Sequence, residues 1–183
     1  MSEGRAGDVV IGLGNPLMGD DGVGIAALEQ LRAEWDLPDT VELVDGGTWG
    51  MTLLPVIESA ARVLFLDAIR TGRPVGAAVT LSGEEIPRQV ALKVSQHQID
   101  LREVLAVAEL RGTLPPDMVA VGLEPSTFEL GDPMTPAVAD GVGRVVEMAV
   151  EQLRAWGHVC TPSAVNRQPA VGPARGWGTA VNA

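Results

Sequence analysis

The stretch 9–31, VVIGLGNPLMGDDGVGIAALEQL, constrains the fold more than any other part of the chain. Its apolar run 9–11 is typical of a strand buried on both faces at the centre of a sheet. A glycine-rich turn follows, and apolar residues then continue at helical spacing. Two carboxylates, Asp20 and Asp21, lie where the loop meets the helix. Open α/β sheets bind ligands at the carboxyl ends of their strands, so this junction is a candidate site.

The loop admits two further interpretations. Gly12 and Gly14 look like the start of a dinucleotide-binding G-x-G-x-x-G motif, but Leu17 stands where the third glycine belongs and Pro16 has no N–H for a phosphate. The adjacent acids would also repel a pyrophosphate at the helix end, which argues against a nucleotide site. The other interpretation is structural, with one acid as a helix cap and its neighbour as a favourable first-turn charge. This structural interpretation can apply to one of the two acids, and the other can then be a metal ligand or a proton carrier.

A second and a third strand follow in order along the chain. Residues 41–44 predict a strand that closes on an acid and glycines, and residues 49–61 predict a helix. Residues 62–69 predict a third apolar strand, which stops at Asp67. This alternation predicts parallel strands in the order 2-1-3, so that Asp21 and Asp67 face each other across the topological switch point. A turn or cap role for Asp67 remains open.

The middle of the chain changes pattern. Residues 76–81 predict a fourth strand whose short connection fits an antiparallel edge position, and residues 84–93 are read as irregular. The capping-box sequence from Ser95 to Gln98 opens another helix and places His97 in its first turn. The helix dipole there favours the neutral imidazole, which can bind a metal, although a first-turn histidine can also simply face water.

The last elements complete the fold prediction. Residues 118–123 predict a buried strand, and Thr135-Pro136 begins a final helix that ends near residue 157. We therefore expect an α/β three-layer sandwich, with a twisted, mostly parallel five-stranded sheet that has one antiparallel strand, and helices on both faces. We also expect residues 1–160 to form a single domain and residues 161–183 to be a disordered tail. His158 and Cys160, at the root of the tail, are interpreted as structural or incidental.

Composition excludes several classes of function. A formal net charge of −11 over 183 residues argues against nucleic acids and anionic membranes as partners. Cys160 is the single cysteine, so neither an intrachain disulfide nor a thiolate cluster can form. No signal-peptide pattern and no membrane-length apolar run occurs, so we expect a cytoplasmic protein without membrane insertion.

The three candidate residues suggest a metal-binding chemistry. Asp21, Asp67 and His97 offer two carboxylates and one imidazole, which would leave positions open on a divalent ion. Zinc, nickel and cobalt would all fit such a set, and ligand type alone does not choose among them. Neither an HExxH motif nor a G-x-S-x-G elbow is present, so the common zinc-protease and serine-hydrolase patterns are not indicated.

Four motifs together resemble a known family. GLGNPLMGDDGVG, VDGGTWGM, LFLDAI and SQHQIDL, in this order, are similar to the hydrogenase maturation endopeptidases, which trim the large subunit of nickel–iron hydrogenases. The likeness covers about residues 8–157. It implies that Asp21, Asp67 and His97 are the metal ligands. It also implies that Gly46, Gly47 and Thr48 shape the substrate groove.

The resemblance further implies a reaction. The enzyme would be an endopeptidase, often classed as aspartic-type, that removes the C-terminal extension of the large-subunit precursor after nickel insertion. The nickel would be supplied by the precursor and sensed by the three ligands, and no organic cofactor is expected. Asp21 or Asp67 could act as general base, or nickel could polarise the scissile carbonyl. The alternatives are a non-proteolytic nickel-sensing chaperone of the precursor and a small-molecule metallohydrolase on the same fold.

Overall fold

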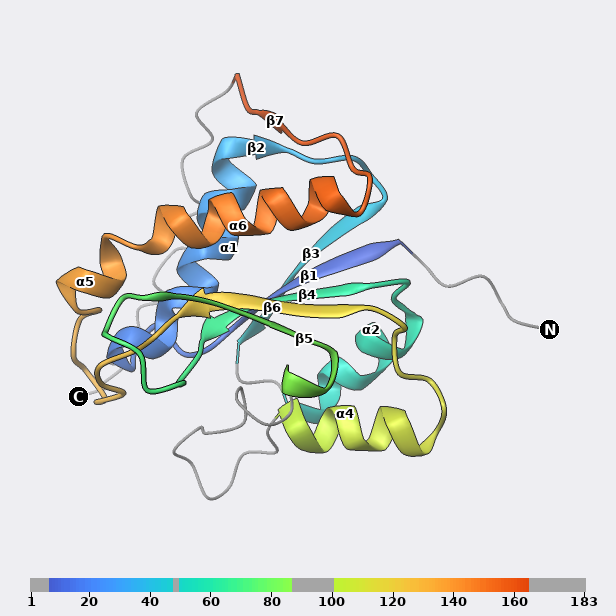
Figure 1. Ribbon diagram of the computed structural model, residues 1–183, viewed down its shortest axis with the longest axis horizontal. Helices are drawn as coiled ribbons and strands as arrows, with labels where there is room; N and C mark the ends of the chain where they lie inside the picture. The colour runs from blue at the N-terminus through green and yellow to red at the C-terminus, as the bar shows by residue number, and fades with distance from the viewer. Residues whose placement is uncertain (1–6, 48–49, 87–100, 165–183) are drawn as a thin grey trace, which may run out of the picture.

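The computed structural model describes residues 7–47, 50–86 and 101–164. A five-stranded sheet in the order β3-β1-β4-β6-β5 runs through the molecule (Figure 1). The strands β3, β1, β4 and β6 run parallel to one another, whereas β5 runs antiparallel to β6 at one edge. This confirms the predicted 2-1-3 order and the antiparallel edge strand. The strands are β1 (Asp8–Leu13), β3 (Val41–Gly47), β4 (Val63–Ala68), β5 (Ala78–Ser82) and β6 (Met118–Leu123).

Helices cover both faces of the sheet, as predicted. In Figure 1, α1 and α6 lie above the sheet and α2 and α4 below it. Successive residues of β1 therefore enter different cores: Ile11 packs in the cluster with Leu105 of α4, and Val10 in the cluster with Leu28 of α1. Each fully buried aliphatic side chain of this kind contributes about 1.5–3 kcal/mol. The bounds are α1 (Val23–Glu34), α2 (Leu54–Ser59), α4 (Leu101–Leu110) and α6 (Val142–Ala155).

Glycines allow α1 to lie directly on the ends of the central strands. A Cβ at Gly24 would lie 2.1 Å from the Leu66 carbonyl oxygen and 2.4 Å from that of Leu13. A Cβ at Gly12 would likewise lie 2.9 Å from the Gly24 carbonyl oxygen. Because any larger residue would push the helix away, these glycines fix how the start of α1 meets β1 and β4.

Two predicted helices are interrupted in the structure. The predicted helix 49–61 is described from residue 50 as a 3-10 turn, η2 (Gly50–Leu53), followed by α2, with Pro55 in the first turn of α2. A proline is tolerated there because the first N–H groups of a helix have no intrahelical partner. The final helix is divided into α5 (Pro136–Ala139) and α6, with Gly141 at the N-cap of α6. The residues read as irregular begin in another 3-10 turn, η3 (Gly83–Glu85), capped by a Ser82–Glu85 capping box.

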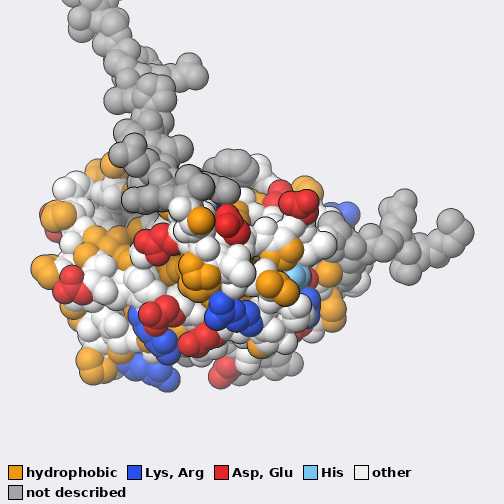
Figure 2. Space-filling view, turned by 90° about the horizontal axis from the view of Figure 1, so that it is seen from above, with side chains coloured by type: hydrophobic (Ala, Val, Ile, Leu, Met, Phe, Trp, Pro, Cys, Tyr) orange, Lys and Arg blue, Asp and Glu red, His pale blue; other side chains and the backbone are white. Residues whose placement is uncertain are grey.

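The outer surface of α6 is charged and exposed to solvent. On the face seen from above in Figure 2, acidic and basic side chains are interspersed. On α6 itself, Arg144 forms ion pairs with Glu147 at 3.0 Å and Glu151 at 3.7 Å. The opposite side of the helix carries the buried residues Val145, Val146, Ala149, Val150 and Leu153, which face the sheet.

A small second sheet extends the packed part of the chain. β2 (Trp35–Asp36), directly after α1, pairs antiparallel with β7 (Thr161–Pro162). The Ser163 N–H then donates to the Glu34 carbonyl at 2.7 Å. Ordered pairing therefore continues to Ser163, three residues past the predicted domain limit, while residues 165–183 of the predicted tail lie outside the described residues. Among the described residues, none of the helices has the length and hydrophobicity that a membrane span needs.

Candidate functional site

Asp21 and Asp67 lie at the carboxyl ends of two adjacent parallel strands. The 3-10 turn η1 (Gly19–Gly22) follows β1 and carries Asp21, while Asp67 is the next-to-last residue of β4. The turn η1 also contacts β4. Both acids therefore occupy one edge of the sheet, formed by the C-terminal ends of β1, β3, β4 and β6, which we call the carboxyl edge. It lies at the left of Figure 1.

The glycine loop wraps around Asp21. The side chain is only 6% exposed, and its Oδ2 accepts a hydrogen bond from the Asn15 backbone N–H at 2.7 Å. Gly14 has φ +114°, and a Cβ there would lie 1.7 Å from the Asp21 carbonyl oxygen. A side chain at this position would therefore collide with the η1 backbone, so Gly14 is required for Asp21 to sit where it does.

Asp67 is fully buried at the end of β4. Its Oδ1 accepts the N–H of the next residue, Ala68, at 2.8 Å. Opposite it in β6 lies Gly122, where a Cβ would lie 1.8 Å from the Asp67 carbonyl oxygen. Asp67 thus lies in a strand, and the alternative of a turn or cap role does not apply. Because Gly122 has no side chain, β4 and β6 can pair closely at this position.

Asp20 differs from Asp21 in its hydrogen-bond partners, which are distant in sequence. It is fully buried, and its carboxylate accepts hydrogen bonds from the backbone N–H groups of Ser126 at 2.8 Å and Thr135 at 2.7 Å, and from the Thr135 hydroxyl at 2.9 Å. Neither η1 nor α5 has a side-chain cap hydrogen bond. The proposed cap role of Asp20 is therefore wrong. Thr135 does lie at the N-cap of α5, with Pro136 in the first turn, but its hydroxyl bonds to Asp20 and not to the helix. Sequence gave no sign of this long-range pairing.

Glu124 is a second buried carboxylate that sequence reasoning missed. It accepts the N–H of Thr71 at 2.7 Å, the Thr71 hydroxyl at 2.7 Å, and the N–H groups of Gly72 at 3.1 Å and Arg73 at 3.2 Å. Burial alone would raise the pKa of Glu124, but these hydrogen bonds outweigh it and hold the pKa below its ordinary value. Glu124 therefore fixes the loop between β4 and β5 as a carboxylate.

Two of the predicted groove residues, Gly46 and Gly47, lie at the end of β3. The register between β1 and β3 shifts by one residue there, because Gly12 pairs with Asp45 and Leu13 with Gly47. The extra residue is Gly46, where a Cβ would lie 2.7 Å from Cγ2 of Ile11. The Gly47 carbonyl accepts the Gly14 N–H at 3.0 Å, so this bulge is joined to the glycine loop.

Two of the predicted site residues, Thr48 and His97, lie outside the described residues, as does the predicted capping box at 95–98. Among the residues that the structure does describe, no three His, Cys, Asp or Glu side chains are grouped closely enough to hold a metal ion. The structure therefore places Asp21 and Asp67 at the same edge, and the three-ligand set stays a prediction.

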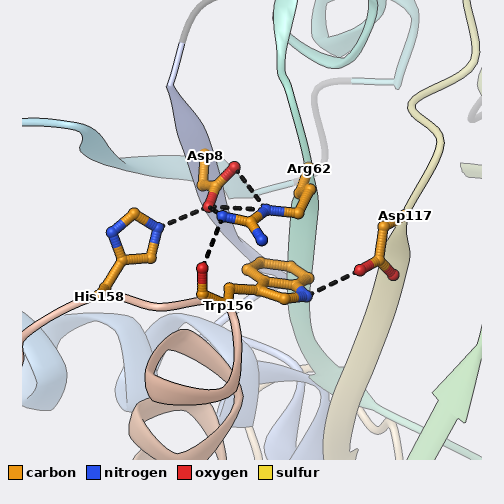
Figure 3. Close-up of polar contacts among 5 residues, drawn as sticks. All are labelled: Asp8, Arg62, Asp117, Trp156 and His158. Carbon is orange, nitrogen blue, oxygen red and sulfur yellow. Dashed lines mark hydrogen bonds and ion pairs between the residues drawn. The ribbon is translucent and has the colours of Figure 1, made fainter.

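The other end of the sheet carries a separate polar cluster (Figure 3). Arg62 donates through Nε to both carboxylate oxygens of Asp8 at 3.0 Å, and His158 Nε2 lies 2.5 Å from Asp8 Oδ2. The guanidinium also lies over the Trp156 ring, whose Nε1 donates to Asp117 at 2.8 Å. Burial raises the pKa of Asp8, but Arg62 and His158 together bring it below its ordinary value. His158 is thus part of a structural cluster, in agreement with the sequence interpretation.

Comparison with known proteins finds similarity to proteins of hydrogenase maturation. The family model described as hydrogenase maturation protease matches residues 25–152. The Hydrogenase 2 maturation protease of Escherichia coli is 33% identical over 155 residues, covering 84% of this chain and 94% of the relative. The hydrogenase expression/formation protein HupD of Rhodobacter capsulatus is 36% identical over 167 residues, covering 90% of this chain and 80% of the relative.

A solved structure agrees with the sequence relatives. The hydrogenase maturating endopeptidase HybD from E. coli superposes with a TM-score of 0.79 at 32% identity, covering 85% of this chain and 97% of that chain. A hydrogenase maturation protease HycI from Thermococcus kodakarensis gives a TM-score of 0.63 at 25% identity, covering 83% and 95%. Both comparisons therefore agree with the sequence relatives on the fold of this chain.

Proposed function

Because the chain belongs to the hydrogenase maturation protease family, we propose that it removes the C-terminal extension of a nickel–iron hydrogenase large-subunit precursor once nickel has been inserted. The chain is a peptide-bond hydrolase that acts in hydrogenase maturation. The observation that carries the finer proposal is the placement of two buried acids, Asp21 and Asp67, at the ends of adjacent parallel strands.

The nickel in this proposal is part of the substrate. Asp21 and Asp67, with His97 as the predicted third group, would contact an ion that the precursor already holds. Carboxylate oxygens and an imidazole nitrogen are acceptable nickel ligands, and three protein groups leave room for those of the precursor. Binding of the ion at the carboxyl edge would orient the nearby peptide bond for attack by water. A precursor without nickel would lack this contact and would escape cleavage.

The acids can also take part in proton transfer. Attack of water on a peptide bond requires a group that accepts a proton, and an ionised carboxylate at the reacting bond can do so. Asp20 and Glu124, also at this edge, already accept several hydrogen bonds from the two loops that they hold. We assign the reaction to Asp21 and Asp67 because they lie at the carboxyl ends of the adjacent parallel strands β1 and β4.

The groove for the extended substrate is assigned to the end of β3. Gly46 is buried, but Gly47, the last residue of β3, is partly exposed and has no side chain, and Thr48 follows it directly in the sequence. A peptide segment could approach this backbone closely for that reason. The cytoplasmic location stays a prediction.

The variants Asp21→Asn and Asp67→Asn test the assignment. Each keeps the side-chain volume but removes the charge, so we expect each to lower the cleavage rate of nickel-loaded precursor at least about 100-fold. The readout is the mass of the large subunit over time. The matched control is Asp8→Asn, which changes a buried aspartate at the other end of β1 and should still cleave. Full activity in both site variants would overturn the assignment. If the wild-type protein binds the precursor but does not cleave it, the chaperone alternative would be favoured.

A further inference from the structure

We propose that Asp20 is a positioning residue for the cleavage: it holds the loop of residues 124–135 against η1 and thereby fixes Asp21. We call this segment the β6–α5 loop. The inference rests on the proposed function, because the effect that it predicts is on recognition of the nickel-loaded precursor. The geometry behind it depends only on contacts among described residues.

The Asp20 carboxylate joins both ends of the β6–α5 loop. Its Oδ1 accepts the Thr135 N–H at 2.7 Å and the Thr135 hydroxyl at 2.9 Å, at the end of the loop. Its Oδ2 accepts the Ser126 N–H at 2.8 Å, near the beginning. The side chain is fully buried, so water does not compete for these donors. One carboxylate thus closes a loop of about ten residues onto the turn that follows β1.

Backbone hydrogen bonds continue the same contact on either side. The Asp20 N–H donates to the Thr127 carbonyl at 3.3 Å, and the Gly19 N–H donates to the Asp132 carbonyl at 3.2 Å. In the other direction, the Gly131 N–H donates to the Leu17 carbonyl at 2.8 Å. The β6–α5 loop and the loop before η1 therefore form one hydrogen-bonded unit, and the Asp20 side chain lies at its centre.

This unit determines where Asp21 is held. Asp20 and Asp21 are consecutive residues of a four-residue turn, so a fixed Asp20 leaves little freedom for the backbone of Asp21. A group that contacts a substrate productively must be held to within a fraction of an ångström, which is normally the task of neighbouring hydrogen bonds. An Asp20→Asn variant would keep the shape but would present an amide NH₂ to N–H or O–H donors. One buried donor would then lose its acceptor.

Steady-state cleavage separates positioning from folding. We expect Asp20→Asn and Thr135→Val to raise KM for nickel-loaded precursor about tenfold, because a loosely held Asp21 weakens the contact made on binding. Thr135→Ser keeps the hydroxyl and should stay near the wild-type KM. The matched control is again Asp8→Asn, which destabilises the fold through a distant buried aspartate and should leave KM unchanged.

Hydrogen exchange supplies a readout that needs no cleavage. In Asp20→Asn and Thr135→Val, amides of residues 126–135 should exchange at least about tenfold faster than in the wild type, while those of β1 and β4 stay protected. If Asp20→Asn does not fold, the comparison of Thr135→Val with Thr135→Ser decides the question. Wild-type KM in folded variants, or unchanged exchange in the β6–α5 loop, would overturn the positioning role. If the wild type fails to cleave while the loop loosens as expected, the proposed function fails and the holding role of Asp20 stands.

Discussion

The Thr135 hydroxyl donates to the carboxylate of Asp20, 115 residues earlier in the chain, at 2.9 Å. Asp21, the next residue, accepts instead from the Asn15 N–H only six residues away. The two neighbouring aspartates therefore have different roles. Asp20 bonds to a loop that is distant in sequence, whereas Asp21 bonds to the loop directly after β1. This division leaves Asp21 as the acid that we assign to the substrate's nickel.

The predicted third nickel contact can be removed at little structural cost. We expect His97→Ala to abolish cleavage of nickel-loaded precursor. It should change the free energy of unfolding by no more than about 1 kcal/mol, because the sequence predicts His97 in the first turn of a helix, where a histidine contributes little to stability. Urea unfolding measures the stability, and the mass of the large subunit measures cleavage. Retained cleavage would remove His97 from the proposed site.

The contacts of Asp8 with Arg62 and His158 make the free energy of unfolding depend on pH in the acid range. The pKa of Asp8 is lower in the folded protein than its ordinary value of 3.8, so the folded state favours the charged form. This contribution is complete above the unfolded pKa and is lost as pH falls through the folded one. We expect Asp8→Asn to lose about 3 kcal/mol at pH 7, because Arg62 and His158 lose their anionic partner.

Urea unfolding between pH 7 and pH 2.5 tests this expectation. The difference between the wild type and Asp8→Asn should shrink as pH falls below 3.8. Asp39→Asn, at an exposed position, is the matched control and should show no comparable difference at any pH. An equal loss of stability at every pH would contradict the ion-pair explanation.

Gly24 should tolerate no side chain. In Gly24→Ala the new Cβ would lie 2.1 Å from the Leu66 carbonyl oxygen, so we expect a loss of about 3 kcal/mol. Gly143→Ala on α6 is the matched control, because its nearest neighbour atom would be Nε2 of Gln30 at 3.8 Å. That change should stabilise the protein by about 0.5–1 kcal/mol through helix propensity. Thermal unfolding compares the two, and a harmless Gly24→Ala would show that α1 is not held by close contact.

Cys160 should react slowly in the folded protein. Its thiol is buried, and burial raises its pKa although the nearby Arg154 partly opposes this. Because the thiolate is the reactive form, we expect modification by Ellman's reagent at pH 8 to be at least about tenfold slower than that of free cysteine. The reaction should reach the unhindered rate in urea. Rapid modification under native conditions would show that the β2–β7 region opens readily.

The strand order and the placement of Asp21 and Asp67 could be predicted because they depend on local signals. Continuous apolar runs identified the buried strands, and the strand–helix alternation fixed their parallel order. The role of Asp20 could not be predicted, because its partners Ser126 and Thr135 are remote in sequence and a cap is the usual interpretation of such residues. The anchoring of the β4–β5 loop by Glu124 escaped detection for the same reason.

In the proposed function, the enzyme recognises nickel in its substrate through Asp21 and Asp67. The most direct measurement compares, by mass spectrometry, the cleavage of nickel-loaded and nickel-free large-subunit precursor by the same wild-type preparation. We predict that the nickel-loaded precursor loses its C-terminal extension and that the nickel-free precursor keeps its full mass. Equal cleavage of both precursors would contradict nickel recognition, even though it would confirm a protease.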